Sequence, residues 1–423
     1  MPPMRRRPFL LPALLLMTAS SAAAQAGTPL ERARRILREA PLIDGHNDVV
    51  WEIRTSKTAP FDVDAYDLGK RTSGHTDVAR LAAGGVGAQF WSIYVPGDIE
   101  GGRYARTQLE EFDIARRMVA KYPEHLTLAV SSADIDRAMK DRKVASLLGM
   151  EGGHAIENSL GALRAYYDLG ARYMTLTHNV TLDWADAAND TAKHGGLTPF
   201  GREVVREMNR LGMLVDLSHV SPGVMSNALD VSEAPVIFSH SSARALADVP
   251  RNVPDSILAR LPKNGGVVMV TFVPGFVSQE LVEWERDASR ARKEFSGDSA
   301  QRRAQWQEYR QAHPRPRATL GQVADHIDHV RKVAGVDHVG IGSDFDGVEE
   351  LPVGLEDVSK YPDLIAELAR RGWSDEDLRK LSRGNVLRAL RQAEEVAARL
   401  RKTRAPSVRT IESLDGAGAR STP

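Results

Sequence analysis

Five short polar clusters each follow a run of apolar residues, and this repeated arrangement constrains the fold more than any other feature of the sequence. The clusters carry His46 and Asp48, Glu151, His219, His240 and Asp344. Such side chains at the ends of successive apolar strands indicate a parallel barrel with a metal-dependent hydrolytic site at its mouth. A single strand-end histidine or aspartate more often makes a turn or a loop hydrogen bond, but five clusters in one context favour a shared site.

Eight apolar runs predict eight β-strands. They lie near residues 41–46, 86–94, 145–151, 172–177, 213–218, 235–240, 266–272 and 338–344. Most are continuous rather than alternating, as parallel strands buried on both faces are. Helix-like segments with N-caps and glycine stops separate them, such as the one from Thr198 to Gly212. We therefore predict an α/β fold, a (β/α)8 TIM-like barrel that forms one metal-dependent domain over residues 27–402.

Two segments depart from this alternation. Residues 277–318 are rich in Arg, Glu, Gln and Ala, and we interpret them as an added helical excursion over the barrel between the seventh and eighth strands. Such an excursion either forms part of a binding pocket or is a solvated helical hairpin without a chemical role, and the sequence leaves both open. Residues 403–423 are polar and contain Gly, Ser and Pro, which predicts a disordered tail.

Residues 1–26 have the pattern of a secretory signal peptide. Arg5, Arg6 and Arg7 precede the apolar stretch 9–17, and the small residues at 22–26 offer cleavage sites. Since the apolar stretch is too short to span a bilayer, an uncleaved anchor is the less favoured alternative. We expect an exported protein, periplasmic or secreted after cleavage, with no membrane anchor in the mature chain.

Composition narrows the chemistry further. The chain has no cysteine, which excludes disulfides and thiolate ligands and leaves His, Asp and Glu to bind a metal. These ligands suit zinc or another divalent first-row metal. Without residues 1–26 the chain has 53 basic and 56 acidic residues, so that no nucleic-acid partner is expected.

The strand-end ligands could bind two metal ions. His46 and Asp48 are two apart in an extended segment, so that both side chains can reach one ion. Glu151 has two carboxylate oxygens and can bridge two metals, while His219 and His240 can complete the second coordination sphere. Five ligands with one bridging carboxylate suffice for a binuclear site with open positions for water and substrate.

Further residues could act on a substrate. Asp344 could accept a proton from the attacking water and pass it to a leaving group, although Asp346 competes for that role. His178 could donate a hydrogen bond to a developing oxyanion. Arg251 and Asn252 could hold a substrate carboxylate. The alternative for His178, Arg251 and Asn252 is a structural hydrogen bond or a surface ion pair.

The remaining histidines give weaker signals. His326 and His329 are three apart on a helical pattern with acidic neighbours, which predicts a solvated helix face. His75 and His154 lie near informative segments, but the sequence assigns them no role.

Ten segments in this order resemble the membrane dipeptidase family, also called renal dipeptidases, among the amidohydrolase-like metallo-barrels. They are Ile43–Asp48, Gly74–Asp77, Gly84–Trp91, Glu151–His154, Leu176–His178, Trp184–Asp186, Asp216–His219, Ser239–Ser242, Arg251–Pro254 and Gly342–Gly347. The similarity extends from about residue 35 to residue 395.

The resemblance implies a dipeptidase with two zinc ions, in which Glu151 bridges the pair. His46 and Asp48 would bind one Zn²⁺, and His219 and His240 the other. His178 and Arg251 would contact the dipeptide, and Asp344 would transfer protons. The family often accepts a D-residue on the C-terminal side, and some members open carbapenem-type β-lactams.

Animal members of the family use disulfides and a lipid anchor, neither of which this chain has, so a homodimer would be held without disulfides.

Two other functions stay open at this point. One is a metallo-hydrolase for other small amides, β-lactams or lactones, since one barrel supports many chemistries. The other is a non-catalytic exported protein that binds metal or peptide. The presence of every ligand and acid–base position of the family pattern argues against the non-catalytic alternative.

Overall fold

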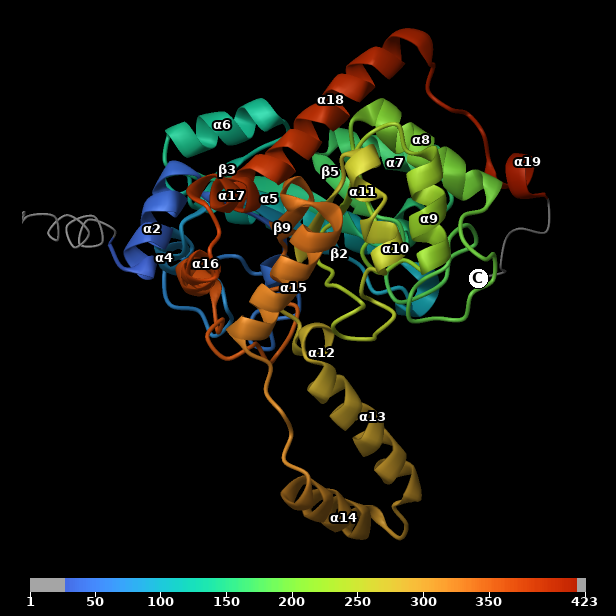
Figure 1. The fold of residues 1–423 in the computed structure, drawn as a ribbon. Helices are drawn as coiled ribbons and strands as arrows, with labels where there is room; N and C mark the ends of the chain where they lie inside the picture. Colours follow the sequence, from blue (N-terminus) through green and yellow to red (C-terminus); the bar gives the residue numbers. More distant parts are fainter. Residues whose placement is uncertain (1–26, 417–423) are drawn as a thin grey trace, which may run out of the picture.

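The computed structural model describes residues 27–416, and at its centre is a closed parallel β-barrel (Figure 1). Its eight strands are β1 (Leu42–Asn47), β2 (Val86–Tyr94), β4 (Val144–Glu151), β5 (Ala171–Thr175), β6 (Leu214–Asp216), β7 (Val236–Phe238), β8 (Val267–Val270) and β9 (Val339–Ile341). Strands that are consecutive in the ring pair in parallel, and the pairs of β1 with β9 and β2 with β4 close it. The predicted (β/α)8 TIM-like barrel is confirmed.

One further strand, β3 (Leu126–Leu128), is not predicted by the sequence. It pairs in parallel with the first residues of β4, before the part of β4 that pairs with β5. A run of three residues is too short to show a strand period, so only the pairing partner identifies it.

The helices lie outside the barrel, and most of them pack against it (Figure 1). They are α2 (Pro29–Glu39), α3 (Val49–Arg54), α4 (Val78–Gly84), α5 (Tyr104–Lys121), α6 (Ser132–Lys140), α7 (Leu160–Asp168), α8 (Pro199–Leu211), α9 (Pro222–Val231), α10 (Asp255–Leu258), α11 (Leu261–Asn264), α12 (Pro274–Val277), α13 (Gln279–Glu294), α14 (Ser299–Ala312), α15 (Leu320–Ala334), α16 (Tyr361–Arg370), α17 (Asp375–Arg379), α18 (Asn385–Thr403) and α19 (Ile411–Asp415). Both predicted ends of α8 are confirmed. The side chain of the N-cap residue Thr198 accepts a hydrogen bond from the Gly201 amide, and Gly212 at the C-terminal end adopts a left-handed conformation with φ of 86°.

The strands are buried on both faces, which explains their continuous apolar sequences. Phe90 and Tyr173 belong to the cluster inside the barrel, whereas the neighbouring Trp91 and Met174 belong to the cluster between strands and helices. Successive side chains of a strand point to opposite faces, so both layers of the core come from the same short runs.

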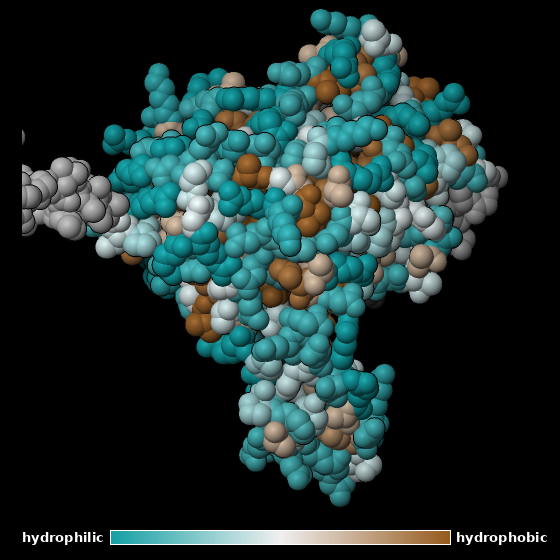
Figure 2. Space-filling model, in the orientation of Figure 1, coloured by the Kyte–Doolittle hydropathy of each residue, from teal (hydrophilic) through white to brown (hydrophobic). Residues whose placement is uncertain are grey.

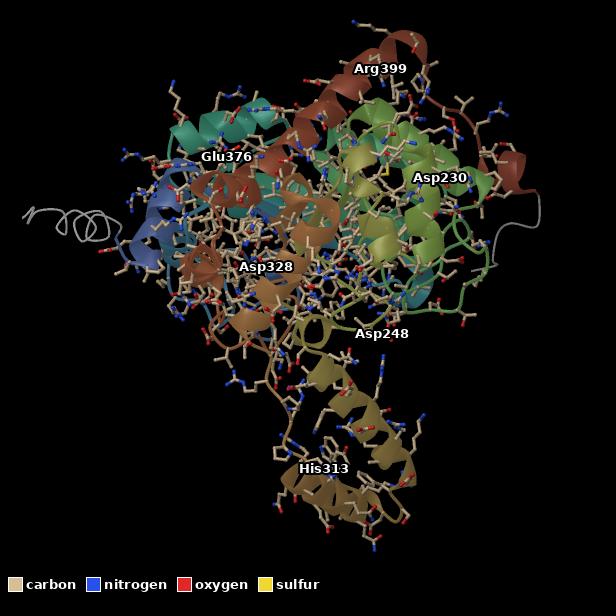
Figure 3. The ribbon with its side chains drawn as sticks, in the orientation of Figure 1. Asp230, Asp248, His313, Asp328, Glu376 and Arg399 are labelled. Carbon is tan, nitrogen blue, oxygen red and sulfur yellow. The ribbon has the colours of Figure 1, made fainter. Side chains whose placement is uncertain are left out.

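The excursion between β8 and β9 is an arm formed by α13 and α14, which projects away from the barrel instead of lying over it (Figure 1). Helix α14 has no buried residue. Trp284 of α13 packs against Trp306 and Tyr309 of α14, at ring-centroid distances of 6.0 and 6.3 Å. The two helices of the arm are therefore held to each other by aromatic packing. Figure 3 places His313, at the end of α14, on the arm and away from the barrel.

The prediction of a disordered tail from residue 403 is wrong for the part that the structure describes. Beyond α18 the chain continues to the short helix α19, where Ile411 is buried. The Asp415 carboxylate accepts a hydrogen bond from the Phe200 amide at the start of α8. Leu414 also packs against the core, and Ser407 bonds with Arg164 and Glu207. These few contacts anchor the segment, a signal too small to stand out in a polar sequence.

The predicted signal peptide, residues 1–26, lies outside the described residues, as do residues 417–423 of the predicted tail. Within residues 27–416 none of the helices combines the length and the apolar character that crossing a membrane requires. Figure 2 shows a largely hydrophilic face on which apolar residues are scattered.

Candidate metal centre

The barrel brings the five predicted metal ligands to one place. His46 and Glu151 lie at the carboxyl ends of β1 and β4, Asp48 follows β1, and His219 and His240 follow β6 and β7. The carboxyl ends of parallel barrel strands open on the same face, so residues far apart in the chain converge there. Possible ligand atoms lie within 4.8 Å of one another in three overlapping groups, which together contain all five residues, His178 and Asp344.

Glu151 stands at the centre of this cluster. Its Oε2 is 3.4 Å from Nε2 of His46, and its Oε1 is 3.0 Å from Nε2 of His219 and 3.5 Å from Nε2 of His240. Asp48 Oδ2 lies 3.2 Å from the same Nε2 of His46. One carboxylate thus faces His46 through one oxygen and the other two imidazoles through its second oxygen, the arrangement that a bridging ligand needs.

The three imidazoles are oriented by contacts on the ring nitrogen that faces away from Glu151. The Nδ1 atoms of His46, His219 and His240 lie 2.9 Å from Tyr173 Oη, 3.3 Å from Asn179 Oδ1 and 2.8 Å from Ser239 Oγ, respectively. With Nδ1 donating to an oxygen, Nε2 keeps its lone pair for a metal. His46 Nε2 has no hydrogen-bond partner within the described residues although it is buried, which fits a metal ligand.

Burial and local charge favour the forms of these groups that bind metals. Burial, assisted by the positive charge of Arg251, lowers the pKa of His219 and His240 well below the ordinary value, so both are neutral near pH 7. Burial raises the pKa of the Glu151 carboxyl, but the neighbouring His46 and His219 outweigh it and hold that pKa well below its usual range.

His46 behaves differently because it faces more negative charge. Burial lowers its pKa, but the oxygens of Tyr173, Asp48 and Glu151 outweigh burial and raise the pKa well above the ordinary value. Two carboxylates beside one imidazole attract positive charge, which a metal cation would supply.

Two buried aspartates that the sequence analysis did not assign hold the strand ends in place. Asp216 at the end of β6 accepts hydrogen bonds from the amides of Ser218 and Ser239 at 3.1 and 2.8 Å, and from the hydroxyls of Thr175 and Ser239. Since Ser239 donates its proton to Asp216, its oxygen accepts from His240 Nδ1. Asp216 therefore ties β5, β6 and β7 together and sets the tautomer of a ligand.

Asp44 ties the ends of β1 and β9 together in the same way. Its carboxylate accepts from the amides of His46 and Ser343 at 3.2 and 2.9 Å, from the Ser343 hydroxyl at 2.6 Å and from the Tyr361 hydroxyl. Burial raises the pKa of Asp44 and of Asp216, and these donors oppose that rise. A polar residue within an otherwise apolar strand, two or three positions before a ligand, is the sequence signal that could have identified both.

A cavity of about 420 Å³ opens above the cluster. Besides metal ligands, its lining includes three of the predicted catalytic and substrate-binding residues, His178, Arg251 and Asp344. Tyr94 and Phe276, which no sequence motif indicates as site residues, also line it. None of residues 277–318 lines this cavity, so the arm contributes no pocket wall.

Asp344 lies at this cavity in a left-handed backbone conformation with φ of 68°. Burial and the charges of Asp48 and Glu151 raise the pKa of its carboxyl well above the ordinary value, against the opposing effect of His46. A carboxyl of this kind beside the ligand cluster can hold and release a proton.

His178 and Arg251 approach the cluster from other sides. His178 Nε2 is 3.9 Å from Glu151 Oε1, and its ring packs against Tyr94 and His219. Arg251 is buried, its guanidinium lies 3.4 Å from the His240 carbonyl oxygen, and it has no carboxylate within ion-pair distance among residues 27–416. Burial lowers its pKa to about 10, which leaves it charged at neutral pH. An unpaired buried cation at a cavity fits an anionic substrate group.

Asn252 lies elsewhere than predicted. It is fully buried, does not line the cavity, and uses its amide group to bind the Ser242 amide and the carbonyls of Ala247 and Phe276. It thereby fixes the loop that presents Arg251 and Phe276.

The prediction of a solvated face is wrong for His326. This residue is buried, accepts a hydrogen bond from the Ala243 amide and contacts the Val277 carbonyl. The loop after β7 and the base of the arm cover this helix face, and a helical pattern alone could not reveal them. His329 pairs with Asp255 at 2.8 Å. His154 is buried and contacts the Val95 carbonyl at 2.8 Å.

Comparison with known proteins relates the chain to dipeptidases and metallo peptidases. A sequence model of the membrane dipeptidases, peptidase family M19, matches residues 30–404. The probable dipeptidase PvdM from Pseudomonas aeruginosa has 25% identity and a TM-score of 0.75, covering 87% of this chain and 99% of that protein. A metallo peptidase from Rhodobacter sphaeroides, solved with a phosphinate mimic of the dipeptide L-Ala-D-Ala, has 25% identity and a TM-score of 0.70, covering 84% and 99%. A metallo peptidase called dipeptidase AC has 26% identity and a TM-score of 0.70, covering 84% and 98%.

Replacing Asp216 by asparagine tests how far the metal centre depends on the buried aspartates. The amide keeps the shape but places an NH₂ group against hydrogen-bond donors, so we expect Asp216→Asn to lower the free energy of unfolding by about 2–4 kcal/mol. We also expect metal affinity to fall roughly 10–100-fold. Denaturant unfolding and metal titration measure both effects.

Asp230→Asn is the matched control, because Asp230 lies on an outer helix (Figure 3), is exposed and pairs with Arg260, which lies on no strand. Its expected cost is below about 0.5 kcal/mol. Wild-type stability and metal affinity in Asp216→Asn would contradict the role given to this carboxylate.

Proposed function

The chain belongs to the membrane dipeptidase family, and from this we propose that it is a zinc-dependent dipeptidase with two Zn²⁺ ions bridged by Glu151. Metallo-dipeptidases of this family hydrolyse peptide bonds. The observation that carries the finer proposal is the Glu151 carboxylate, whose two oxygens face the Nε2 atoms of His46 on one side and of His219 and His240 on the other.

The donor set supports zinc. His46 and Asp48 would hold one ion, and His219 and His240 the other, with Glu151 common to both. Imidazole and carboxylate ligands without thiolate suit Zn²⁺. Two zinc ions bound there would lower the pKa of a water molecule toward neutrality and polarise the scissile carbonyl.

The protein's own residues would bind the substrate and move protons. The Arg251 guanidinium would bind the C-terminal carboxylate of the dipeptide, which limits substrates to short peptides. His178 would donate a hydrogen bond to the oxyanion that forms on the scissile carbonyl. The Asp344 carboxylate would take a proton from the attacking water and deliver it to the leaving amine.

The stereochemical part of the proposal is that a D-residue is accepted on the C-terminal side. The structure of the Rhodobacter sphaeroides metallo peptidase with a mimic of L-Ala-D-Ala supports this. The carboxylate site at Arg251 fixes one end of the C-terminal residue without requiring a particular side chain.

The first test is hydrolysis of L-Ala-L-Ala, L-Ala-D-Ala and Gly-D-Ala by protein of measured metal content. We expect turnover with two zinc ions per chain, loss of turnover on chelation and recovery with Zn²⁺, because the ligands are preformed. Full metal loading without cleavage of any dipeptide would overturn the proposal and favour other small amides, β-lactams or lactones.

The carboxylate site is tested with Arg251→Ala. Loss of a buried charge-assisted contact should lower kcat/KM roughly 100-fold for a dipeptide. The same substitution should change kcat/KM for the C-terminal amide of that dipeptide less than about threefold, because no carboxylate is lost. Arg244→Ala, at a more exposed neighbouring arginine that pairs with Asp248, serves as control. Equal losses for the acid and the amide would contradict the assignment.

Proton transfer is tested with Asp344→Asn, which keeps the size of the side chain but cannot accept the proton. We expect both metals to remain bound and kcat for L-Ala-D-Ala to fall at least about 100-fold with little change in KM. Asp346→Asn is the matched comparison, since Asp346 lines the same cavity. A near-normal kcat in Asp344→Asn, or a larger loss in Asp346→Asn, would exclude Asp344 as the proton carrier.

A further inference from the structure

A second cavity, of about 1100 Å³, adjoins the pocket above the metal ligands. Both cavities are lined by Glu52, Asp346, Gly347 and Val348. These four residues therefore form a shared wall between the catalytic pocket and a larger, polar space. The proposed dipeptidase mechanism gives Glu52 no role, and Asp346 enters it only as a comparison.

Asp346 has an unused hydrogen-bonding capacity at this wall. Its side chain is fully buried, and its Oδ1 accepts a hydrogen bond from the His75 amide at 2.6 Å. Within the described residues, its Oδ2 makes no hydrogen bond of normal geometry, and neither does the buried hydroxyl of Tyr66, which lines the second cavity. The hydroxyls of Thr76 and Thr72 interact with Asp346 and Tyr66, respectively, and each lowers the pKa of its neighbour. Burial, together with the charges of Asp346 and Glu52, raises the pKa of Tyr66 to about 12. Unsatisfied buried acceptors of this kind indicate a place where a donor binds.

Glu52 adds a second carboxylate that has no ion-pair or hydrogen-bond partner for its side chain among residues 27–416. It lies on α3, where its amide donates to the Asp48 carbonyl at 3.1 Å, one helical turn beyond that ligand. Burial and the charges of Asp346 and Asp48 raise its pKa, and Lys57 opposes this only as the smallest effect. The local excess of negative charge would be relieved by a bound cation.

The position of Arg251 decides which end of a dipeptide reaches this wall. Arg251 lies beside the His240 carbonyl, and its charge acts on His219 and His240. Glu52 lies one helical turn beyond Asp48, and the charges that act on it are those of Asp346, Asp48 and Lys57, not that of Arg251. A dipeptide with its carboxylate at Arg251 and its scissile carbonyl at the metal ligands therefore has its N-terminal residue at the Glu52 wall.

We infer that Glu52 and Asp346 bind the positively charged side chain of a lysine or arginine at the N-terminal position of the dipeptide. This inference rests on the proposed dipeptidase function and assigns the substrate class of the same site. A cationic side chain supplies the donors that Asp346 Oδ2 and Tyr66 lack, and a long one can enter the larger cavity. The α-amino group is a weaker candidate, because it is attached next to the scissile carbonyl and stays close to the metal ligands.

The test compares kcat/KM for L-Lys-Ala with that for L-norleucyl-Ala, which has a side chain of similar length without the charge. The C-terminal alanine is given the configuration that the enzyme cleaves. We expect the metal-loaded wild type to prefer the lysine substrate roughly tenfold, and Glu52→Gln to remove most of that preference. Cleavage of L-Ala-Ala should change less than about twofold in Glu52→Gln, since this substrate lacks the side chain that the wall binds.

Glu349→Gln is the matched control, because Glu349 lines the second cavity but not the pocket above the metal ligands, so its loss removes the same charge outside the shared wall. It should leave the lysine preference unchanged. Equal cleavage of the lysine and norleucine substrates by the wild type, or an unchanged ratio in Glu52→Gln, would overturn the inference while the dipeptidase function stands.

Two other results are also decisive. An equal loss for all three substrates in Glu52→Gln would assign the carboxylate to the α-amino group and reject the side-chain site. If the metal-loaded wild type cleaves none of the dipeptides, the proposed function fails and the inference fails with it. The L-Ala-Ala rate of the wild type distinguishes that case from failure of the inference alone.

Discussion

Two fully satisfied buried carboxylates, Asp44 and Asp216, hold the barrel strands at the end where the ligands begin. Each accepts four hydrogen bonds, from residues at neighbouring strand ends and, for Asp44, also from Tyr361 of α16. A buried charge is tolerated only when such donors surround it, and removing the charge would leave the donors unpaired. The same bonds fix the strand ends relative to one another, so the candidate ligands that follow are already positioned by the fold. The site is preorganised by the barrel rather than by flexible loops.

At the barrel mouth, the negative charge of the carboxylates is not balanced by hydrogen bonds in the same way. Asp48, Glu151 and Asp344 lie close together, and Arg251, the cation beside the cluster, makes no ion pair with them. Burial is the main reason for the raised pKa of Asp344, whereas it opposes the rise at His46; the charges of Asp48 and Glu151 raise the pKa of both groups. Metal cations would balance this charge, and they would leave Arg251 free for an anionic substrate group.

Loops at the barrel mouth carry the other pocket residues, and they are attached to the barrel without changing the positions of the strand ends. Asn252 and His326 are buried and bind backbone groups, which holds the loop of Arg251 and Phe276 against the base of the arm. The arm projects beyond that base and leaves the pocket open. The wall with Glu52 and Asp346 separates this pocket from a larger polar space. The pocket is thus lined both by the Arg251 cation and by the Glu52 and Asp346 carboxylates, and under the proposed function these groups would bind the opposite charges of a zwitterionic or basic dipeptide.

The sequence by itself determined the barrel and the set of candidate ligands at its mouth. Continuous apolar runs identify strands buried on both faces, and a His, Asp or Glu at the end of such a run must lie at the barrel mouth, because parallel strands share their direction. Tertiary structure alone decided the pairing of β3, the burial of His326, the anchoring of α19 and the placement of Asn252 behind the pocket. It also decided the wall at which Glu52 meets Asp346, nearly three hundred residues later in the chain. The local sequence pattern predicts which side chains are buried. Which distant loop covers a helix face, or brings a second carboxylate to a cavity, depends on packing between segments that no local pattern contains.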